Sequence, residues 1–312
     1  MYTIKEASAR SGVGIPLLRA WERRYGVVVP TRTPSGYRLY DDAAIQRLSA
    51  MRQLIAAGWS AQQAAERVGT ASELEVAGLT AGPQAAGPGT GASTVATDPS
   101  TADDLVGRLV TASRVIDANG LEAALDEAFS SGRFEVVTDS IVMPALRAIG
   151  DGWERGDISV AGEHAASHAV LRRLAMAYEA AGDVAGERPI LVGLGSGGRH
   201  ELGALAFATA ARRAGLPVLY LGPDLPPESW TSAAAARDAV AAVIGIPTRA
   251  DVPRARSVID ALRAARHALL LAVGGDEARR LASTDDVIQL TGDLSHSVGT
   301  LRSAIGRAHS GR

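Results

Sequence analysis

A stretch without Lys, Arg or aromatic residues divides the chain into two parts, and it constrains the fold more than any other feature. Residues 69–100 read GTASELEVAGLTAGPQAAGPGTGASTVATDPS, with repeated Gly and Pro. This composition is typical of flexible linkers. We therefore expect a multidomain protein, with an N-terminal domain at 1–70, a flexible linker at 71–100 and a larger C-terminal part, which agrees with a length of 312 residues.

The charge is distributed unevenly between these parts. The whole chain has a net charge of −2, which by itself argues against binding to nucleic acid. Residues 1–70, however, hold ten Lys or Arg against five Asp or Glu, a net charge of +5 that leaves −7 for the remainder. The same segment holds six of the thirteen aromatic residues. Interleaved basic and aromatic residues indicate a nucleic-acid-binding surface in the N-terminal domain.

Two absences in the sequence limit the chemistry. The chain has no Cys, which excludes disulfides, thiolate metal sites and a Cys nucleophile. It also has no apolar run near the roughly 18 residues that span a bilayer. We expect a cytoplasmic protein without a membrane partner.

The apolar pattern changes within the C-terminal part. Over 101–185 apolar residues recur at helical spacing between Gly-containing breaks, which predicts a four-helix bundle. Over 186–312 five short apolar runs alternate with helical stretches: PILVGLG, VLYLG, AAVIGIP, ALLLAVGG and VIQLTG. This alternation predicts an α/β Rossmann-like domain with a five-stranded parallel sheet.

The N-terminal domain has the pattern of a helix–turn–helix followed by a wing. Helices are expected from Thr3 to Arg10 and from Pro16 to Tyr25, and a hairpin in VVVPTRTPSGYRLYD. Two more helices are expected, Asp41–Ala57 and Ser60–Val68. The segments TIKEASARSGVGIPLLRAWERRYG and PSGYRLYD resemble the all-α winged helix–turn–helix of the MerR type. The resemblance implies binding to double-stranded operator DNA through eight side chains of the second helix and the wing: Arg19, Trp21, Arg23, Arg24, Arg32, Tyr37, Arg38 and Tyr40.

A histidine follows the first predicted strand of the sheet, at the edge where open α/β sheets bind ligands. His200-x-x-Gly203 is followed after 41 residues by Gly245-Ile246-Pro247 and after 26 more by Gly274-Gly275. This spacing resembles the Asp-x-His-x-x-Gly, Ser-x-Leu and Gly-Gly motifs of the cobalamin-binding fold of methionine synthase and the mutases. The resemblance implies that His200 is the lower axial ligand of cobalt and that Gly203, Gly245, Gly274 and Gly275 make room for the nucleotide tail.

Two positions depart from that motif. Gly198 stands where the motif has its acid, so the carboxylate that would bond to the ligating imidazole is missing, and Glu201 is a candidate substitute. Gly245 stands where the motif has Ser, which removes a hydroxyl that could bond to the tail.

The predicted bundle carries a second signature. Trp153 is followed after nine residues by Glu163-His164. This pattern resembles the adenosylcobalamin cap of the light-sensing MerR-type repressors of the CarH, CarA and LitR type, where the Trp packs against the upper axial adenosyl group. Members of that family often carry His directly after the Trp, whereas this chain has Glu154.

The combined resemblance implies a transcriptional regulator, most simply a repressor and not an enzyme. Its cofactor would be adenosylcobalamin, which in the dark assembles a homotetramer on the operator, and light would disassemble it. Three alternatives remain: a MerR-type regulator that has lost the light switch or cobalamin itself, a corrinoid-carrying methyltransferase module, and a metal site of His164 and His168.

Overall fold

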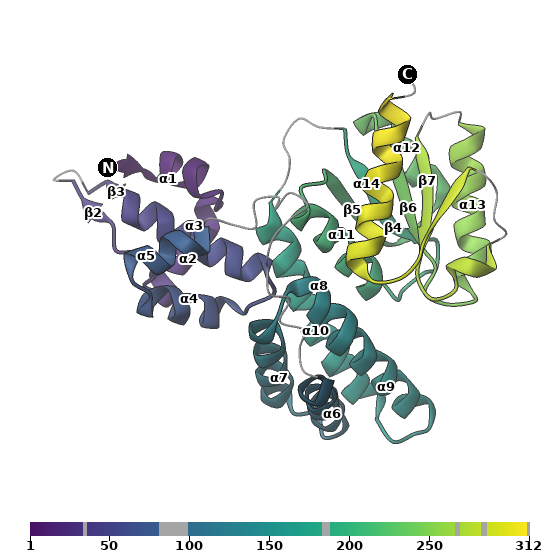
Figure 1. Ribbon diagram of the computed structural model, residues 1–312, viewed down its shortest axis with the longest axis horizontal. Coiled ribbons are helices and arrows are strands. Elements are labelled where there is room, and N and C mark those ends of the chain that lie inside the picture. Colours follow the sequence, from purple (N-terminus) through teal and green to yellow (C-terminus); the bar gives the residue numbers. More distant parts are fainter. Residues whose placement is uncertain (34–35, 81–98, 183–187, 266–268, 282–285, 311–312) are drawn as a thin grey trace.

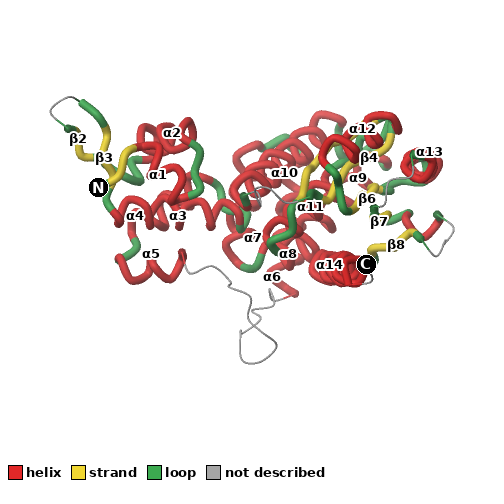
Figure 2. The backbone as a smooth tube through the Cα atoms, turned by 90° about the horizontal axis from the view of Figure 1, so that it is seen from above, coloured by secondary structure: helices red, strands yellow, loops and turns green. Residues whose placement is uncertain are grey.

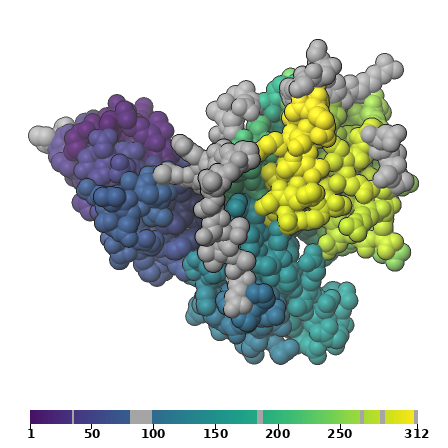
Figure 3. All heavy atoms as spheres, viewed as in Figure 1, coloured from purple at the N-terminus to yellow at the C-terminus, as the bar shows by residue number. Residues whose placement is uncertain are grey.

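The computed structural model describes residues 1–33, 36–80, 99–182, 188–265, 269–281 and 286–310. The N-terminal domain, residues 1–80, forms a lobe of its own, and the rest of the chain forms a helical cap, residues 99–182, and a sheet domain, residues 188–310 (Figure 1). A space-filling view shows the N-terminal lobe lying beside the cap (Figure 3). Within the described residues, no helix is long and apolar enough to cross a membrane.

The N-terminal domain is the predicted winged helix–turn–helix. Helix α1 (Ile4–Ser11) begins with a capping box, in which Thr3 and Glu6 bond to each other's backbone N–H groups. Gly12 then turns the chain with φ +69°, a conformation that favours glycine. The remaining elements are α2 (Ile15–Tyr25), α3 (Asp42–Ala56), α4 (Ala61–Thr70) and an antiparallel sheet of β1 (Tyr2–Thr3), β2 (Thr31–Arg32) and β3 (Arg38–Tyr40).

The structure corrects the start of the expected linker. Glu73–Thr80 form helix α5, which packs on α3 (Figure 2). Ser72 and Glu75 bond to each other at its start, Val76 is buried, and the Gln53 side chain donates to the Thr80 carbonyl. A small, Gly-containing segment is thus ordered by tertiary packing that its composition does not reveal. Residues 81–98 of the expected linker lie outside the described residues.

The predicted bundle is confirmed as the helical cap. Helices α6 and α7 pack against each other, α8, the π-helix η1 and α9 follow one another without a break, and α10 packs against α6, α7 and α9. Their bounds are α6 (Pro99–Arg114), α7 (Ala118–Ser131), α8 (Phe134–Val137), η1 (Thr138–Val142), α9 (Met143–Glu154) and α10 (Val160–Ala181). The cap core is built from Leu, Val, Ala and Phe side chains, as the scarcity of aromatic residues in the sequence requires.

The predicted parallel sheet is also confirmed. Its strands lie in the order β5-β4-β6-β7-β8, so the chain reverses direction across the sheet between β5 and β6. Helices α11 and α14 share a core with the cap on one face, and α12 and α13 cover the other. The elements are β4 (Ile190–Gly195), α11 (Leu202–Arg213), β5 (Val218–Leu225), α12 (Pro227–Arg237), β6 (Ala241–Gly245), α13 (Asp251–Ala264), β7 (Leu270–Gly274), η2 (Ala278–Arg280), β8 (Val287–Leu290) and α14 (Leu294–Ser310).

Candidate functional site

A cavity of about 830 Å³ lies between the helical cap and the carboxyl edge of the sheet. Helices α9 and α10 line one side, and the loops that follow β4, β6, β7 and β8 line the other. A ligand site at this edge is the general expectation for an open parallel sheet. All eight cofactor candidates from the sequence line this cavity: Trp153, Glu163, His164, His200, Gly203, Gly245, Gly274 and Gly275.

His200 belongs to the loop between β4 and α11, and its side chain is exposed toward the cavity. Asp224 of the neighbouring strand β5 fixes this loop, because its side chain accepts a 2.5 Å hydrogen bond from the Gly197 N–H. The Asp224 N–H in turn donates to the Gly198 carbonyl at 3.0 Å, and Asp224 has φ +55°, which is unusual for a residue with a side chain. These bonds fix the backbone just before His200.

The missing acid of the motif has a steric explanation. A Cβ atom at Gly198 would lie 3.0 Å from the Gly195 carbonyl oxygen and 3.1 Å from the Leu194 Cβ. The suggested substitute, Glu201, is engaged elsewhere, because its carboxylate accepts a 2.8 Å hydrogen bond from the Tyr220 hydroxyl. Burial and this carboxylate raise the pKa of Tyr220, so the phenol keeps its proton.

The glycines give the sheet side of the cavity its open shape. A Cβ atom at Gly203 would have no other heavy atom within 4 Å, so this position opens onto free space. At Gly275 a Cβ would lie 2.7 Å from the Ile246 carbonyl oxygen, and the backbone has φ +108°. Glycine is therefore needed at Gly275 for backbone reasons, and at Gly203 it leaves space that a ligand can fill.

The cap side presents an aromatic ring and a charged cluster. Trp153, near the end of α9, is 48% exposed although it is a large apolar side chain. On α10, Glu163 Oε2 lies 2.6 Å from His164 Nδ1, and Ser167 donates to Glu163 Oε1 at 2.5 Å. Burial would raise the pKa of Glu163, but these hydrogen bonds and the nearby His164 and His200 outweigh it and lower the pKa. The carboxylate is thus held ionised beside the cavity.

Glu154 and His168 bear on two alternatives from the sequence, a regulator without a light switch and a metal site of His164 and His168. Glu154, which follows the Trp, lines the cavity as well. The rings of His164 and His168 are 6.1 Å apart, but only His164 lines the cavity. Within the described part of the chain no group of three or more His, Asp or Glu side chains could hold a metal ion, so a site of this pair has no third protein ligand there.

Sequence reasoning missed the contacts that join the two sides of the cavity. Arg147 of α9 pairs with Asp276 after β7 at 3.1 Å, and Asp139 of η1 accepts a 2.9 Å hydrogen bond from the Leu294 N–H at the start of α14. Burial raises the pKa of Asp139. Both acids can be read from the sequence, but the partner of Asp276 lies 129 residues away and that of Asp139 lies 155 residues away.

These residues fit a cobalamin. The sheet side offers one imidazole on a fixed loop and a glycine-lined space, and the cap side offers an exposed indole facing the same cavity. An imidazole is a suitable nitrogen ligand for cobalt, and an aromatic ring can pack on a flat apolar ligand surface.

In the N-terminal domain five of the DNA-binding candidates are exposed on helix α2 and on the wing. Arg19, Arg23 and Arg24 of α2 and Arg32 and Tyr37 of the wing are all exposed, with Tyr37 at 73%. They form a basic surface that can contact phosphates.

Two of the sequence candidates for DNA contact are not exposed in the structure. Trp21 is 3% exposed and Tyr40 is 1% exposed, and both belong to the core of the domain. The Tyr40 hydroxyl donates to Glu22, and burial with this negative charge raises the pKa of Tyr40 to about 12. Arg38 is half-buried and bonds to the same Glu22 carboxylate at 3.0 Å, so Arg38 ties the wing to α2.

Comparison with known proteins agrees with this architecture. Residues 2–68 match the MerR HTH family regulatory proteins, and residues 105–178, within the helical cap, match the B12 binding domain family. The chain also resembles the monomethylamine corrinoid protein of Methanosarcina barkeri in fold, with a TM-score of 0.52, 13% identity and coverage of 66% of this chain and 98% of that one. The protein is therefore a MerR-type DNA-binding transcriptional regulator with a B12-binding domain.

Two curated relatives narrow the class. The HTH-type transcriptional repressor CarH of Myxococcus xanthus is 32% identical over 230 residues, which cover 73% of this chain and 72% of CarH. The repressor CarA of the same organism is 28% identical over 264 residues, covering 84% of this chain and 82% of CarA. The chain belongs to the CarH family of HTH-type transcriptional repressors.

Proposed function

We propose that this regulator is a cytoplasmic repressor that binds adenosylcobalamin between its cap and its sheet domain, and that the cofactor and light control its assembly on operator DNA. One observation carries the proposal. Five separate segments of the cap and the sheet domain, which together form the sensor, line a single cavity; they carry Trp153, Glu163-His164, His200-x-x-Gly203, Gly245 at the end of β6 and Gly274-Gly275 at the end of β7. That convergence supports a cobalamin held from both sides.

In this proposal each side of the cavity has its own task. His200 would provide a nitrogen ligand for cobalt, and the loop bonds of Asp224 keep its backbone in place. Gly203 leaves space that the nucleotide tail would fill, Gly245 lines the same cavity, and Trp153 would cover the cofactor from the cap side. Bound adenosylcobalamin supplies a cobalt–carbon bond that light can cleave.

Assembly would convert weak DNA contacts into tight ones. The N-terminal domain has a small contact surface, and several copies joined through their cofactor-bound sensors gain affinity by avidity. The cofactor can favour the assembled state only if it binds that state more tightly. We propose that the assembled form is a homotetramer that binds the operator in the dark.

An absorption spectrum tests the proposal. Protein incubated with adenosylcobalamin in darkness and then desalted should retain a cobalamin chromophore at about one per chain. Illumination should change the spectrum and convert the assembled form to a smaller species in size-exclusion chromatography. A protein that emerges from desalting without the chromophore would contradict the proposed cofactor.

A second candidate is a cobalamin-dependent regulator without a light switch. Glu154 favours it, because this residue lines the cavity where light-switching relatives often have His. His164 is the cap histidine that lines the cavity and could serve in its place. Retained cobalamin together with DNA binding that is unchanged by illumination would select this second candidate.

A further inference from the structure

The N-terminal domain is docked on the rest of the molecule through the end of helix α3. The last carbonyl groups of a helix have no partners within it and attract cations. Here the carbonyl of Ala56, the last residue of α3, and that of Gly58, in the turn just after the helix, each accept a hydrogen bond from a guanidinium group of another domain. We call the two donors, Arg173 and Arg213, the guanidinium clamp.

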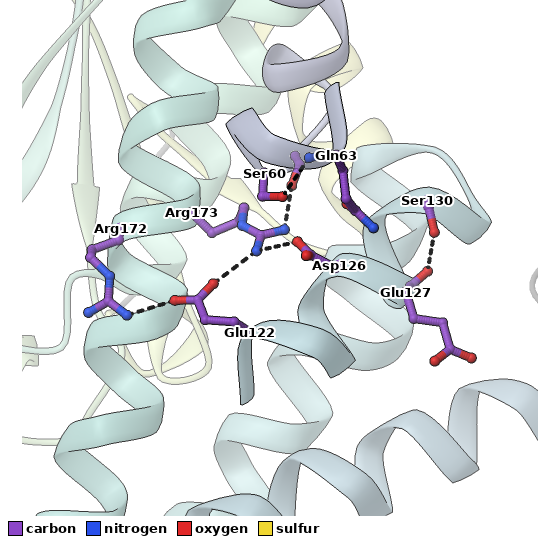
Figure 4. Close-up of polar contacts among 9 residues, drawn as sticks. Ser60, Gln63, Glu122, Asp126, Glu127, Ser130, Arg172 and Arg173 are labelled. Atoms are coloured by element: carbon purple, nitrogen blue, oxygen red, sulfur yellow. Dashed lines mark hydrogen bonds and ion pairs between the residues drawn. The ribbon is translucent and has the colours of Figure 1, made fainter. Parts of the chain in front are cut away.

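The first arm of the clamp is almost completely buried. Arg173, on α10 of the helical cap, is 3% exposed and donates to the Gly58 carbonyl at 3.0 Å. Its Nη2 atom donates to Glu122 at 3.0 Å and to Asp126 at 2.7 Å, and both acids lie on α7 (Figure 4). A buried guanidinium needs such carboxylates, and they also orient it toward the N-terminal domain.

The second arm belongs to the sheet domain. Arg213, the last residue of α11, donates to the Ala56 carbonyl at 2.7 Å and to Glu135 at 2.9 Å. Arg173 lies over the ring of Phe129 and Arg213 over that of Phe134, and these two rings stack at 5.8 Å. The stacked pair thus lies directly beside both guanidinium groups.

The contact between the domains is close around the clamp. A Cβ atom at Gly58 would lie 2.2 Å from Phe129 Cδ1, so the backbone of the N-terminal domain rests directly on the cap. On the same side, Arg52 donates to the Ala180 carbonyl of α10 at 2.8 Å. The wing strands β2 and β3 lie at the far end of the N-terminal domain, so docking leaves the wing uncovered (Figure 1).

Both arms sit on helices whose opposite ends reach the cavity. Helix α10 carries Glu163 and His164 near its start and Arg173 nearer its end, while α11 begins just after His200 and ends at Arg213. The cavity lies between the cap and the sheet domain, which carry one arm each. A ligand that holds these two parts together therefore also holds the two arms at the separation that docking needs.

We propose that the guanidinium clamp is a docking site that fixes the orientation of the DNA-binding domain and that filling the cavity strengthens this docking. The first half of the proposal is independent of the cofactor, and the second half rests on the proposed function. The domain orientation is then set by the sensor and not only by the segment over residues 81–98.

The absence of cysteine in the chain makes the test direct. Fluorophores are attached to L74C on α5, where Leu74 is 88% exposed, and to A236C on α12, an exposed position of the sheet domain. Single-molecule energy transfer then reports whether the N-terminal domain is docked. The clamp variants are R173Q and R213Q, and the matched control is R172Q, because Arg172 pairs with Glu122 but does not contact the N-terminal domain.

The unchanged chain and R172Q should give one narrow distribution. Each clamp variant should lower the ratio of docked to undocked molecules roughly tenfold or more, as expected for the loss of a hydrogen bond from a charged donor. Circular dichroism checks the fold, and R213Q keeps the test valid if R173Q does not fold, because the Arg213 side chain is less deeply buried. Distributions of R173Q and R213Q that match the unchanged chain would overturn the docking site.

The coupling is measured on labelled R213Q, in which docking is only partial, with and without adenosylcobalamin in darkness. The docked population should rise when the cofactor is bound, as judged by the retained absorption. Bound cofactor with an unchanged docked population would overturn the coupling while leaving the cofactor site intact. Loss of all cofactor on desalting would instead contradict the proposed function, and the coupling with it.

Discussion

The cofactor cavity and the DNA-binding surface differ in how well the sequence predicted where the candidate residues lie in the structure. All eight cofactor candidates line one cavity, whereas two of the eight DNA-binding candidates, Trp21 and Tyr40, are buried in the core of the N-terminal domain. Five of the cavity candidates came from a spacing that runs through three strand ends and three from a signature in the cap, and such spacing constrains position in space. The DNA-binding candidates came from neighbours along one helix and one hairpin, where adjacent residues face different sides.

The largest expected effect concerns the buried aromatic residue of the N-terminal domain. Trp21→Ala should destabilise that domain by about 3–5 kcal/mol, because it removes a large core side chain and leaves a cavity. Denaturant unfolding followed by circular dichroism measures the loss. If Trp21→Ala kept the unfolding midpoint and weakened only DNA binding, Trp21 would return to the DNA-binding surface and the comparison above would fail.

The next effect concerns the proposed cobalt ligand. His200→Ala should lower the affinity for cobalamin by about 100-fold or more, since loss of a direct ligand should exceed the roughly 10- to 100-fold cost of losing a supporting residue. Titration followed by absorption measures it. His168→Ala is the matched control, because His168 is exposed on the cap and does not line the cavity. Equal affinities of the two variants would remove His200 from its role.

The departure at Gly198 offers a test of the steric explanation. Gly198→Asp restores the acid of the cobalamin motif, but its Cβ would meet the Gly195 carbonyl oxygen and Leu194. We expect a loss of about 1–3 kcal/mol of stability from this crowding, without tighter cofactor binding. Thermal unfolding and cofactor titration give both quantities. A more stable variant with improved affinity would show that the loop has room for the acid.

A smaller effect is expected for a single phosphate contact. Arg23→Ala should weaken binding to all DNA sequences by a few-fold and reduce the slope of the salt dependence by about 1. Arg237→Ala, an exposed arginine on α12 of the sheet domain, is the control and should leave the slope unchanged. Fluorescence anisotropy at several salt concentrations gives the slopes, and an unaltered slope for Arg23→Ala would exclude that contact.

The smallest effect is a pH dependence within the N-terminal core. Burial and the neighbouring Glu22 raise the pKa of Tyr40 from 10.0 to about 12. A raised pKa means that the contribution of Tyr40 to stability is fully present below pH 10 and is lost as the pH rises through 12. Tyr40→Phe should therefore lose about 1 kcal/mol at neutral pH and show a weaker fall in stability between pH 10 and 12. Parallel falls in the two proteins would contradict the shift.

Much of the fold could be predicted because each element has a local signal. The five apolar runs became β4 to β8, and the order of His200, Gly245 and Gly274 placed the carboxyl edge of the sheet. Helix α5 escaped prediction because its order depends on packing against α3. The guanidinium clamp could not be predicted for a related reason, since Arg173 and Arg213 bond to carbonyl groups that lie 115 and 157 residues away. Every residue has a backbone carbonyl, so the sequence does not show which one accepts such a bond.

The central claim is that cofactor in the cavity controls DNA binding. The most direct measurement is a gel shift with the promoter region of the regulator's own gene, in darkness without cofactor, in darkness with adenosylcobalamin, and after illumination. The account predicts a stable complex only with adenosylcobalamin in darkness and its loss after illumination. A complex of equal affinity under all three conditions would contradict it.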